Sequence, residues 1–156
     1  MDGGEPNLII RHPREKLSKC SLHGLEDRPD LRFVEFDREP APACDGFLLL
    51  GFDGPPLALE DRDRPLLLID GTWRLADRIV RGWATELAAA EPRSLPADWI
   101  TAYPRRQTEC AEPERGLASV EALYAAYHLT GRSTEGLLAG YRWAEEFLER
   151  NRARLA

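Results

Sequence analysis

The chain is poor in cysteine and has no long apolar run. Its 156 residues include three cysteines, Cys20, Cys44 and Cys110, and none of them belongs to a C-x-x-C pair. This pattern argues against both a disulfide framework and a zinc site. No window has the unbroken apolar length of a membrane-spanning helix, and the first six residues carry two acids, which argues against a signal peptide. By elimination, we expect a cytoplasmic protein with reduced thiols and no metal site.

Several catalytic signatures and an excess of positive charge are also missing. The sequence contains no P-loop, no G-x-G-x-x-G, no G-x-S-x-G and no H-E-x-x-H motif. The formal net charge is -6, so any nucleic-acid binding must use a local basic surface. Hydrophobic residues make up 43% and charged residues 31%, as in ordinary folded proteins. The length predicts a single domain over residues 1–156.

Short runs rich in β-forming residues, with turn residues at their ends, predict strands. These runs lie at 7–10, 32–36, 46–51 and 65–70. The last two are apolar at nearly every position, which is typical of central parallel strands covered on both faces.

Helical spacing of apolar residues follows in the second half of the chain. The predicted helices run from a cap at Thr72 to the Pro92 break, from a cap at Ser119 to Gly131, and from Ser133 almost to the C-terminus. We also predict an extended piece at 99–102, a flexible loop at 53–65 and a long ordered loop at 105–116. The alternation predicts an α/β fold, with a mostly parallel sheet and helices on both faces.

The strongest local signal is the end of the predicted strand at 65–70. It delivers the carboxylate of Asp70, a glycine turn and the ring of Trp73 to the edge where open α/β sheets bind ligands. The residues equally allow Asp70 and Thr72 to cap a helix while Trp73 fills the core.

Two proline-stiffened segments, 93–96 and 102–104, precede the helix that follows Gly116. Free backbone amides at the start of that helix could bind a ligand carboxylate. The alternative is ordinary capping by Ser119, with Glu121 in the first turn.

A loop dense in charge follows the first predicted strand. Arg14, Lys16 and Lys19 are candidates for phosphate contacts, and a solvated surface is the alternative. We expect His12, before a proline, and Cys20, without an activating partner, to be passive.

These motifs together resemble the DTW-domain superfamily of aminocarboxypropyltransferases, whose branches act on tRNA or on small-subunit ribosomal RNA. The resemblance spans nearly the whole chain. It is carried by residues 12–15, 19–21, 70–73, 95–96, 102–104, 117–122 and 141–151.

The resemblance implies a SPOUT-like α/β fold with a C-terminal trefoil knot that binds S-adenosylmethionine. The implied cofactor-binding residues are Ser21, Ile69, Asp70, Trp73, Leu95, Tyr103, Leu117, Ser119, Glu121 and Ala122. Asp70 is the expected catalytic residue, either orienting the transferred arm or helping to deprotonate the target base. Arg105 and Arg106 join Arg14, Lys16 and Lys19 as the expected RNA-binding residues.

The expected reaction is transfer of a 3-amino-3-carboxypropyl group to a uridine or modified uridine. Ribosomal RNA is favoured over tRNA because the tail at 147–151 is closer to the ribosomal branch and the front cysteines of many tRNA enzymes are missing. The partner is a structured RNA, free or within a pre-ribosomal particle, and not DNA or a membrane. Two alternatives stay open: a SPOUT-type RNA methyltransferase and a non-catalytic ribosome-assembly factor. The sequence leaves the oligomeric state open.

Overall fold

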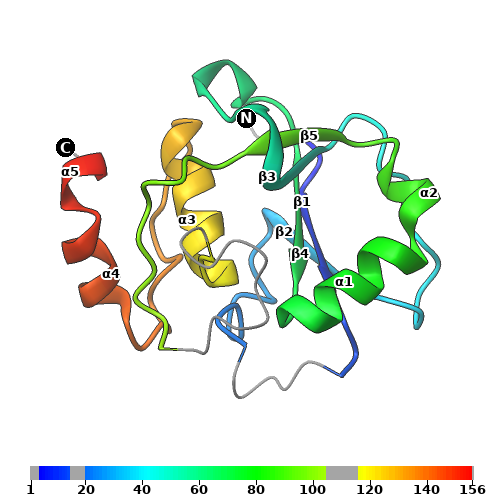
Figure 1. Cartoon of the computed structure of the whole chain (residues 1–156), viewed down its shortest axis with the longest axis horizontal. Coiled ribbons are helices and arrows are strands. Elements are labelled where there is room, and N and C mark those ends of the chain that lie inside the picture. The colour runs from blue at the N-terminus through cyan, green and yellow to red at the C-terminus, as the bar shows by residue number, and fades with distance from the viewer. Residues whose placement is uncertain (1–3, 15–19, 105–115, 156) are drawn as a thin grey trace.

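The computed structural model describes residues 4–14, 20–104 and 116–155, and a five-stranded parallel sheet lies at its centre (Figure 1). The strands are β1 (Asn7–Arg11), β2 (Leu31–Glu35), β3 (Leu48–Pro56), β4 (Leu66–Asp70) and β5 (Glu91–Ser94). Their order is β2-β1-β4-β3-β5, and every pairing between neighbours is parallel. The predicted parallel sheet is therefore confirmed.

The two central strands β1 and β4 end side by side. Their register places Arg11 opposite Asp70 at the carboxyl edge of the sheet. The strand that follows β1 in the chain, β2, lies on one side of this central pair, and the strand that follows β4, β5, lies on the other side. Such a divergence leaves a crevice at the carboxyl edge, where open α/β sheets bind their ligands.

Helices cover both faces of the sheet, as predicted (Figure 1). They are α1 (Trp73–Gly82), α2 (Ala84–Leu87), α3 (Ser119–Leu129), α4 (Ala144–Arg150) and α5 (Arg152–Leu155), with a 3-10 turn, η2 (Leu59–Asp61). In Figure 1, α1 and α2 lie on one side of the sheet, and α3, α4 and α5 lie on the other. Among the described residues, no helix is long and apolar enough to cross a membrane.

Alternating side chains of each strand supply two separate cores. In β1, Leu8 and Ile10 join the core beneath α1 and α2, whereas Ile9 joins the core beneath α3 and α4. The first core includes an edge-on contact between Phe36 and Trp83, with ring centroids 4.9 Å apart. Both faces of β1 are therefore buried, which explains its uninterrupted apolar sequence.

The middle of the chain differs from the predictions in two places. The expected flexible loop at 53–65 is instead the end of β3, which runs to Pro56, followed by η2. The extended piece predicted at 99–102 has no regular secondary structure, and a strand that was not predicted, β5, lies before it and contains Pro92. Proline is tolerated there because β5 is an edge strand.

The segment at 99–102 pairs with a side chain instead of a strand. The amide of Ile100 donates to Oδ1 of Asn151, and Nδ2 of Asn151 donates to the carbonyl oxygen of Ile100, both at 2.8 Å. Asn151 is fully buried. These bonds satisfy the backbone without a neighbouring strand, which a propensity argument does not foresee.

Helix boundaries also differ from the predictions. The helix after Thr72 stops at Gly82, and α2 resumes at Ala84. Residues 133–143 are turns and irregular backbone, so the helix predicted from Ser133 begins only at Ala144, as α4. Apolar spacing through 137–148 reflects burial of successive turns in one core and not a continuous helix.

Candidate functional site

A cavity of about 330 Å³ opens over the carboxyl halves of β3 and β4, between α1 and the start of α3. Its volume lies in the range of small-molecule sites. Most of its lining is apolar, and Asp53 is the single charged lining residue among those described. The cavity therefore suits a ligand with extended apolar surface.

The turn after β4 shapes one wall of this cavity. Gly71 has a φ of 153°, and Thr72 then accepts a hydrogen bond from the amide of Leu75 at 3.3 Å, which caps α1 as predicted. Helical spacing then places Trp73, Ala76 and Val80 along the cavity. A strand end, a glycine turn and a capped helix thus build this wall.

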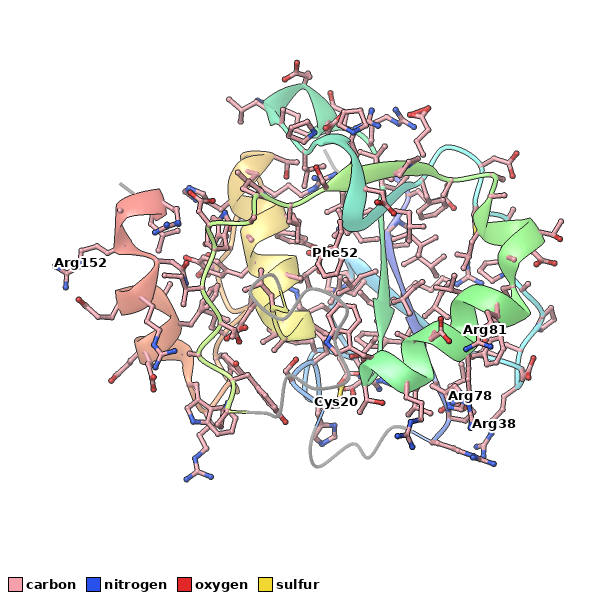
Figure 2. The ribbon with its side chains drawn as sticks, in the orientation of Figure 1. Cys20, Arg38, Phe52, Arg78, Arg81 and Arg152 are labelled. Atoms are coloured by element: carbon pink, nitrogen blue, oxygen red, sulfur yellow. The ribbon has the colours of Figure 1, made fainter. Side chains whose placement is uncertain are left out.

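An aromatic pair forms part of the lining. Phe52, from β3, stacks on Trp73 with ring centroids 5.4 Å apart and an angle of 30° between the planes. Figure 2 places Phe52 in the middle of the molecule, between α1 and α3. Both rings line the cavity. Such a pair offers a flat apolar surface on which a heteroaromatic ring can pack.

A buried charge cluster holds Asp70 at the carboxyl edge. Asp70 is 2% exposed, and its Oδ2 accepts from Nε of Arg11 at 3.1 Å and from Sγ of Cys20 at 3.0 Å. Arg11 also donates to Glu26 at 3.1 Å. Burial, with a further effect of Asp70, raises the pKa of the Cys20 thiol to about 12, so this cysteine is a neutral donor. The carboxylate is therefore fixed in position by two neighbours.

A second buried carboxylate, Glu121, binds four donors. Its Oε1 accepts from the amide of Ala118 at 2.8 Å and from Oγ1 of Thr101 at 2.6 Å. Its Oε2 accepts from the amide of Ala102 at 2.9 Å and from the hydroxyl of Tyr141 at 2.8 Å. Glu121 therefore joins three segments that are distant in sequence. It also replaces Ser119 as the capping residue, because Ala118 is the N-cap of α3 and Ser119 is the first helical residue.

The start of α3 has another partner among the predicted residues. Oγ of Ser21 accepts a hydrogen bond from the amide of Val120 at 3.0 Å. One of the amides expected to be available for a ligand carboxylate is therefore taken by the protein itself. Tyr103 packs edge-on against Trp143, with ring centroids 5.0 Å apart.

The structure brings six of the ten predicted cofactor residues together. Those that line the cavity are Ile69, Trp73, Leu95, Leu117, Ser119 and Ala122. Ser21, Asp70, Tyr103 and Glu121 are not among the lining residues. Arg14 is exposed, and the other predicted RNA-binding residues, Lys16, Lys19, Arg105 and Arg106, lie outside the described part of the chain.

Sequence reasoning missed Phe52, Asp53 and Arg11. Asp53 lies in the stretch predicted to be a loop, and Phe52 follows directly after the predicted strand at 46–51, so their place on a cavity wall was hidden. A signal for Arg11 existed, because a charged residue at the end of an otherwise apolar strand marks a sheet edge. Its pairing with Asp70 depends on the strand order, which a single sequence does not provide.

Comparison with known proteins gives one informative similarity. No family model matches the chain, and no curated protein matches it. Among solved structures, the chain is similar to the SAM-dependent rRNA acp-transferase Tsr3 from Vulcanisaeta distributa, with a TM-score of 0.69 and 26% sequence identity. The similarity covers 96% of this chain and 80% of that one. The α/β fold described above is therefore similar to that of Tsr3 over almost its full length.

Proposed function

We propose that this protein transfers the 3-amino-3-carboxypropyl group of S-adenosylmethionine to a uridine-type base in ribosomal RNA. The observation that carries the proposal is the similarity, over 96% of the chain, to Tsr3, which is a SAM-dependent rRNA acp-transferase. The cavity at the carboxyl edge of β3 and β4 supports it, because motif residues from three separate segments meet there.

The cavity fits the cofactor chemically. The stacked pair Phe52 and Trp73 suits a purine ring, and Leu95, Leu117 and Ala122 supply apolar surface. A volume of about 330 Å³ suits a ligand of this size. These residues, with Ile69 and Ser119, would hold the cofactor.

When bound, S-adenosylmethionine would supply a sulfonium-activated carbon for the new C–N bond to a ring nitrogen of the base, with 5′-methylthioadenosine as the leaving group and loss of the proton on that nitrogen. The protein positions the reacting atoms, because orientation decides which of the three sulfonium substituents reacts. We assign this positioning to the wall formed by Trp73 and Ala76. We assign the orientation of the transferred arm to Asp70, which does not line the cavity itself but is held by Arg11 and Cys20 between two residues that do, Ile69 and Gly71.

The finer features belong to the same proposal. We propose that 1–156 is one domain, that its C-terminal part forms a trefoil knot, and that the protein acts in the cytoplasm. Within the knot, the segments at 95–96 and 117–122 would enclose the cofactor, and both contribute to the cavity lining. A pre-ribosomal particle is the favoured form of the substrate, and tRNA is the second choice.

The test is label transfer to RNA from cells that lack this gene. S-adenosylmethionine labelled in the carboxyl group is incubated with the protein and total RNA, which is then separated into ribosomal and transfer RNA. Carboxyl label in the ribosomal fraction is the expected result. Label in the tRNA fraction changes the substrate, transfer of methyl label alone makes the protein a methyltransferase, and no transfer of either label refutes an enzymatic role.

The role of Asp70 is tested separately with Asp70→Asn. We expect the single-turnover rate to fall about 10²-fold, because a misoriented arm reacts slowly. Exposed Asp63 provides the matched control, Asp63→Asn, with an unchanged rate. A full rate for Asp70→Asn would show that Asp70 neither orients the arm nor assists deprotonation. Binding of S-adenosylmethionine by the variant distinguishes a catalytic defect from a lost fold.

A further inference from the structure

Arg11 is a charged residue that lies almost completely inside the protein. It ends β1 after the apolar residues 8–10, and it is 6% exposed. Burial of a guanidinium group is costly unless its charge and its N–H groups are matched by partners. Arg11 lies opposite Asp70 at the carboxyl edge of the sheet. A buried cation at this edge is therefore a candidate for a role in the site.

Each nitrogen of the Arg11 guanidinium has its own partner. Nε donates to Oδ2 of Asp70 and Nη1 donates to Oε2 of Glu26, both at 3.1 Å. Nη2 lies 3.4 Å from Sγ of Cys20, and Cζ lies 4.6 Å from the centroid of the Phe33 ring. The planar group is thus fixed by two carboxylates, a thiol and an aromatic face. A lysine, which has a single nitrogen, could not make these contacts at the same time.

The contacts of Arg11 and Cys20 fix the direction of the Asp70 carboxylate. Both residues donate to Oδ2, and within the described part of the chain no hydrogen bond reaches Oδ1. Strand alternation puts Asp70 on the same face of β4 as Leu68, which lines the cavity. Figure 2 shows Cys20 between α1 and α3, below Phe52 of the cavity wall. Two donors on one oxygen therefore hold the other oxygen in a set direction next to the cavity.

Glu26 supports Arg11 from the direction of the surface. Its Oε2 accepts from Arg11, and its Oε1 accepts from the amide of Gly24 at 2.7 Å. The side chain of Glu26 is 34% exposed, whereas that of Asp70 is 3% exposed. Arg11 is held between these two carboxylates, so it cannot move toward one without leaving the other.

We propose that Arg11 is a positioning residue that acts through Asp70 and sets the direction in which this carboxylate meets the transferred arm. The proposal rests on the proposed function, in which Asp70 orients that arm. The arm carries an ammonium group, and a carboxylate oxygen is a matching hydrogen-bond acceptor. A misplacement of about 1 Å in a reacting complex can cost about 10²-fold in rate. A residue that aims the carboxylate can therefore control the rate without touching the ligand.

The test is a pair of substitutions measured alone and together. Arg11→Lys keeps a positive charge beside Asp70 but loses the planar group that contacts three partners. We expect its single-turnover rate of carboxyl-label transfer to fall about tenfold, while its affinity for S-adenosylmethionine stays within about twofold of the wild-type value. In the Asp70→Asn background, Arg11→Lys should cause no further loss, because the carboxylate to be aimed is gone. An equal loss in both backgrounds would overturn the proposal, because Arg11 would then act independently of Asp70.

Arg28→Lys is the matched control because it alters a similar ion pair far from the cavity. Nε and Nη2 of Arg28 donate to the two oxygens of Asp30 at 2.9 and 3.0 Å, directly before β2 at the amino edge of the sheet. Its transfer rate should equal that of the wild type. If Arg28→Lys and Arg11→Lys lose rate equally, the effect is one of general stability and the proposal is wrong.

A second variant keeps the test decisive if Arg11→Lys is too unstable to assay. Arg11→Met combined with Asp70→Asn removes both charges, so no uncompensated charge of this pair stays buried. This double variant should transfer label at the rate of Asp70→Asn alone. A slower rate would contradict the proposal.

Failure of the proposed function would give a different result. Wild-type protein that transfers no carboxyl label refutes the aminocarboxypropyltransferase, and the positioning role of Arg11 is refuted with it. Wild-type transfer together with a full rate for Arg11→Lys leaves the proposed function in place and refutes the positioning role alone.

Discussion

Replacing Glu121 by glutamine should destabilise the protein by an amount that follows from its hydrogen bonds. Each carboxylate oxygen serves one backbone amide and one hydroxyl: Ala118 and Thr101 on Oε1, Ala102 and Tyr141 on Oε2. The glutamine side chain keeps one acceptor oxygen and places an NH2 group where the other oxygen was. The hydroxyl on that side can rotate and accept, but the backbone amide cannot. In either orientation, one buried amide therefore faces another donor.

An unsatisfied buried amide costs about 1–3 kcal/mol, and loss of a charged acceptor weakens the remaining bonds. Removing a buried charge offsets part of this loss. We therefore expect Glu121→Gln to lower the free energy of unfolding by about 2 kcal/mol. Tyr141→Phe removes a single donor and leaves the other three bonds of Glu121, so about 1 kcal/mol is expected for it.

Urea unfolding followed by tryptophan fluorescence measures both variants. With a slope of about 2 kcal/mol/M, the Glu121→Gln midpoint should fall by about 1 M without a change in slope. Ala118 lies between the cavity residues Leu117 and Ser119, so affinity for S-adenosylmethionine should fall as well. A variant with the wild-type midpoint would refute this account of the carboxylate.

Three further predictions concern two buried side chains and a glycine of β3. Because burial and the charges of Arg14 and Arg78 lower the pKa of His12 below its ordinary value of 6.5, the stability that this histidine contributes is fully present above pH 6.5 and is lost as pH falls through the lowered pKa. His12→Gln should therefore make the urea midpoint less dependent on pH below 6.5. With a pKa of about 12, Cys20 should resist iodoacetamide at pH 8, and Asp70→Asn should increase its alkylation, measured by peptide mass spectrometry. At Gly54, where φ is 88°, an added Cβ would lie 2.4 Å from the carbonyl oxygen of Pro92. Gly54→Ala should therefore lower the free energy of unfolding, measured in urea, by at least about 2 kcal/mol. A smaller decrease would mean that β5 can move away from the added methyl group.

The elements that could be predicted from the sequence are those whose burial pattern is local. β1 is buried throughout and β4 is buried at four of its five positions, so their apolar runs identify them without knowledge of their neighbours. The cap at Thr72 is equally local. By contrast, β5 exists because β3 offers it an edge, and its sequence Glu91–Ser94 contains a proline and charged residues. Strand propensity gave no indication of it.

The candidate site also has one part that could be predicted from local sequence and one part that could not. The motif at 70–73 could be placed at a sheet edge because it follows an apolar strand and precedes a helix. The cavity wall formed by Phe52 and Asp53 could not, because β3 extends past Gly51 through a bulge opposite β5. A proline-rich segment predicts a loop unless a neighbouring strand supplies hydrogen bonds. The missing information was the pairing of distant segments and not the local chemistry.

The two buried carboxylates, Asp70 and Glu121, differ in what holds them, and this difference bears on their roles. Glu121 accepts from four neutral donors on three segments, so its removal affects the arrangement of the chain around the cavity. Asp70 accepts from Arg11 and Cys20 through one oxygen, at the carboxyl edge where β1 and β4 end side by side. Asp70 does not line the cavity, but its neighbours Ile69 and Gly71 do, so a rigid carboxylate lies directly behind the proposed cofactor site. Changes at Glu121 should therefore alter stability and cofactor affinity together, whereas changes at Asp70 should alter the rate of the bound complex more than its affinity.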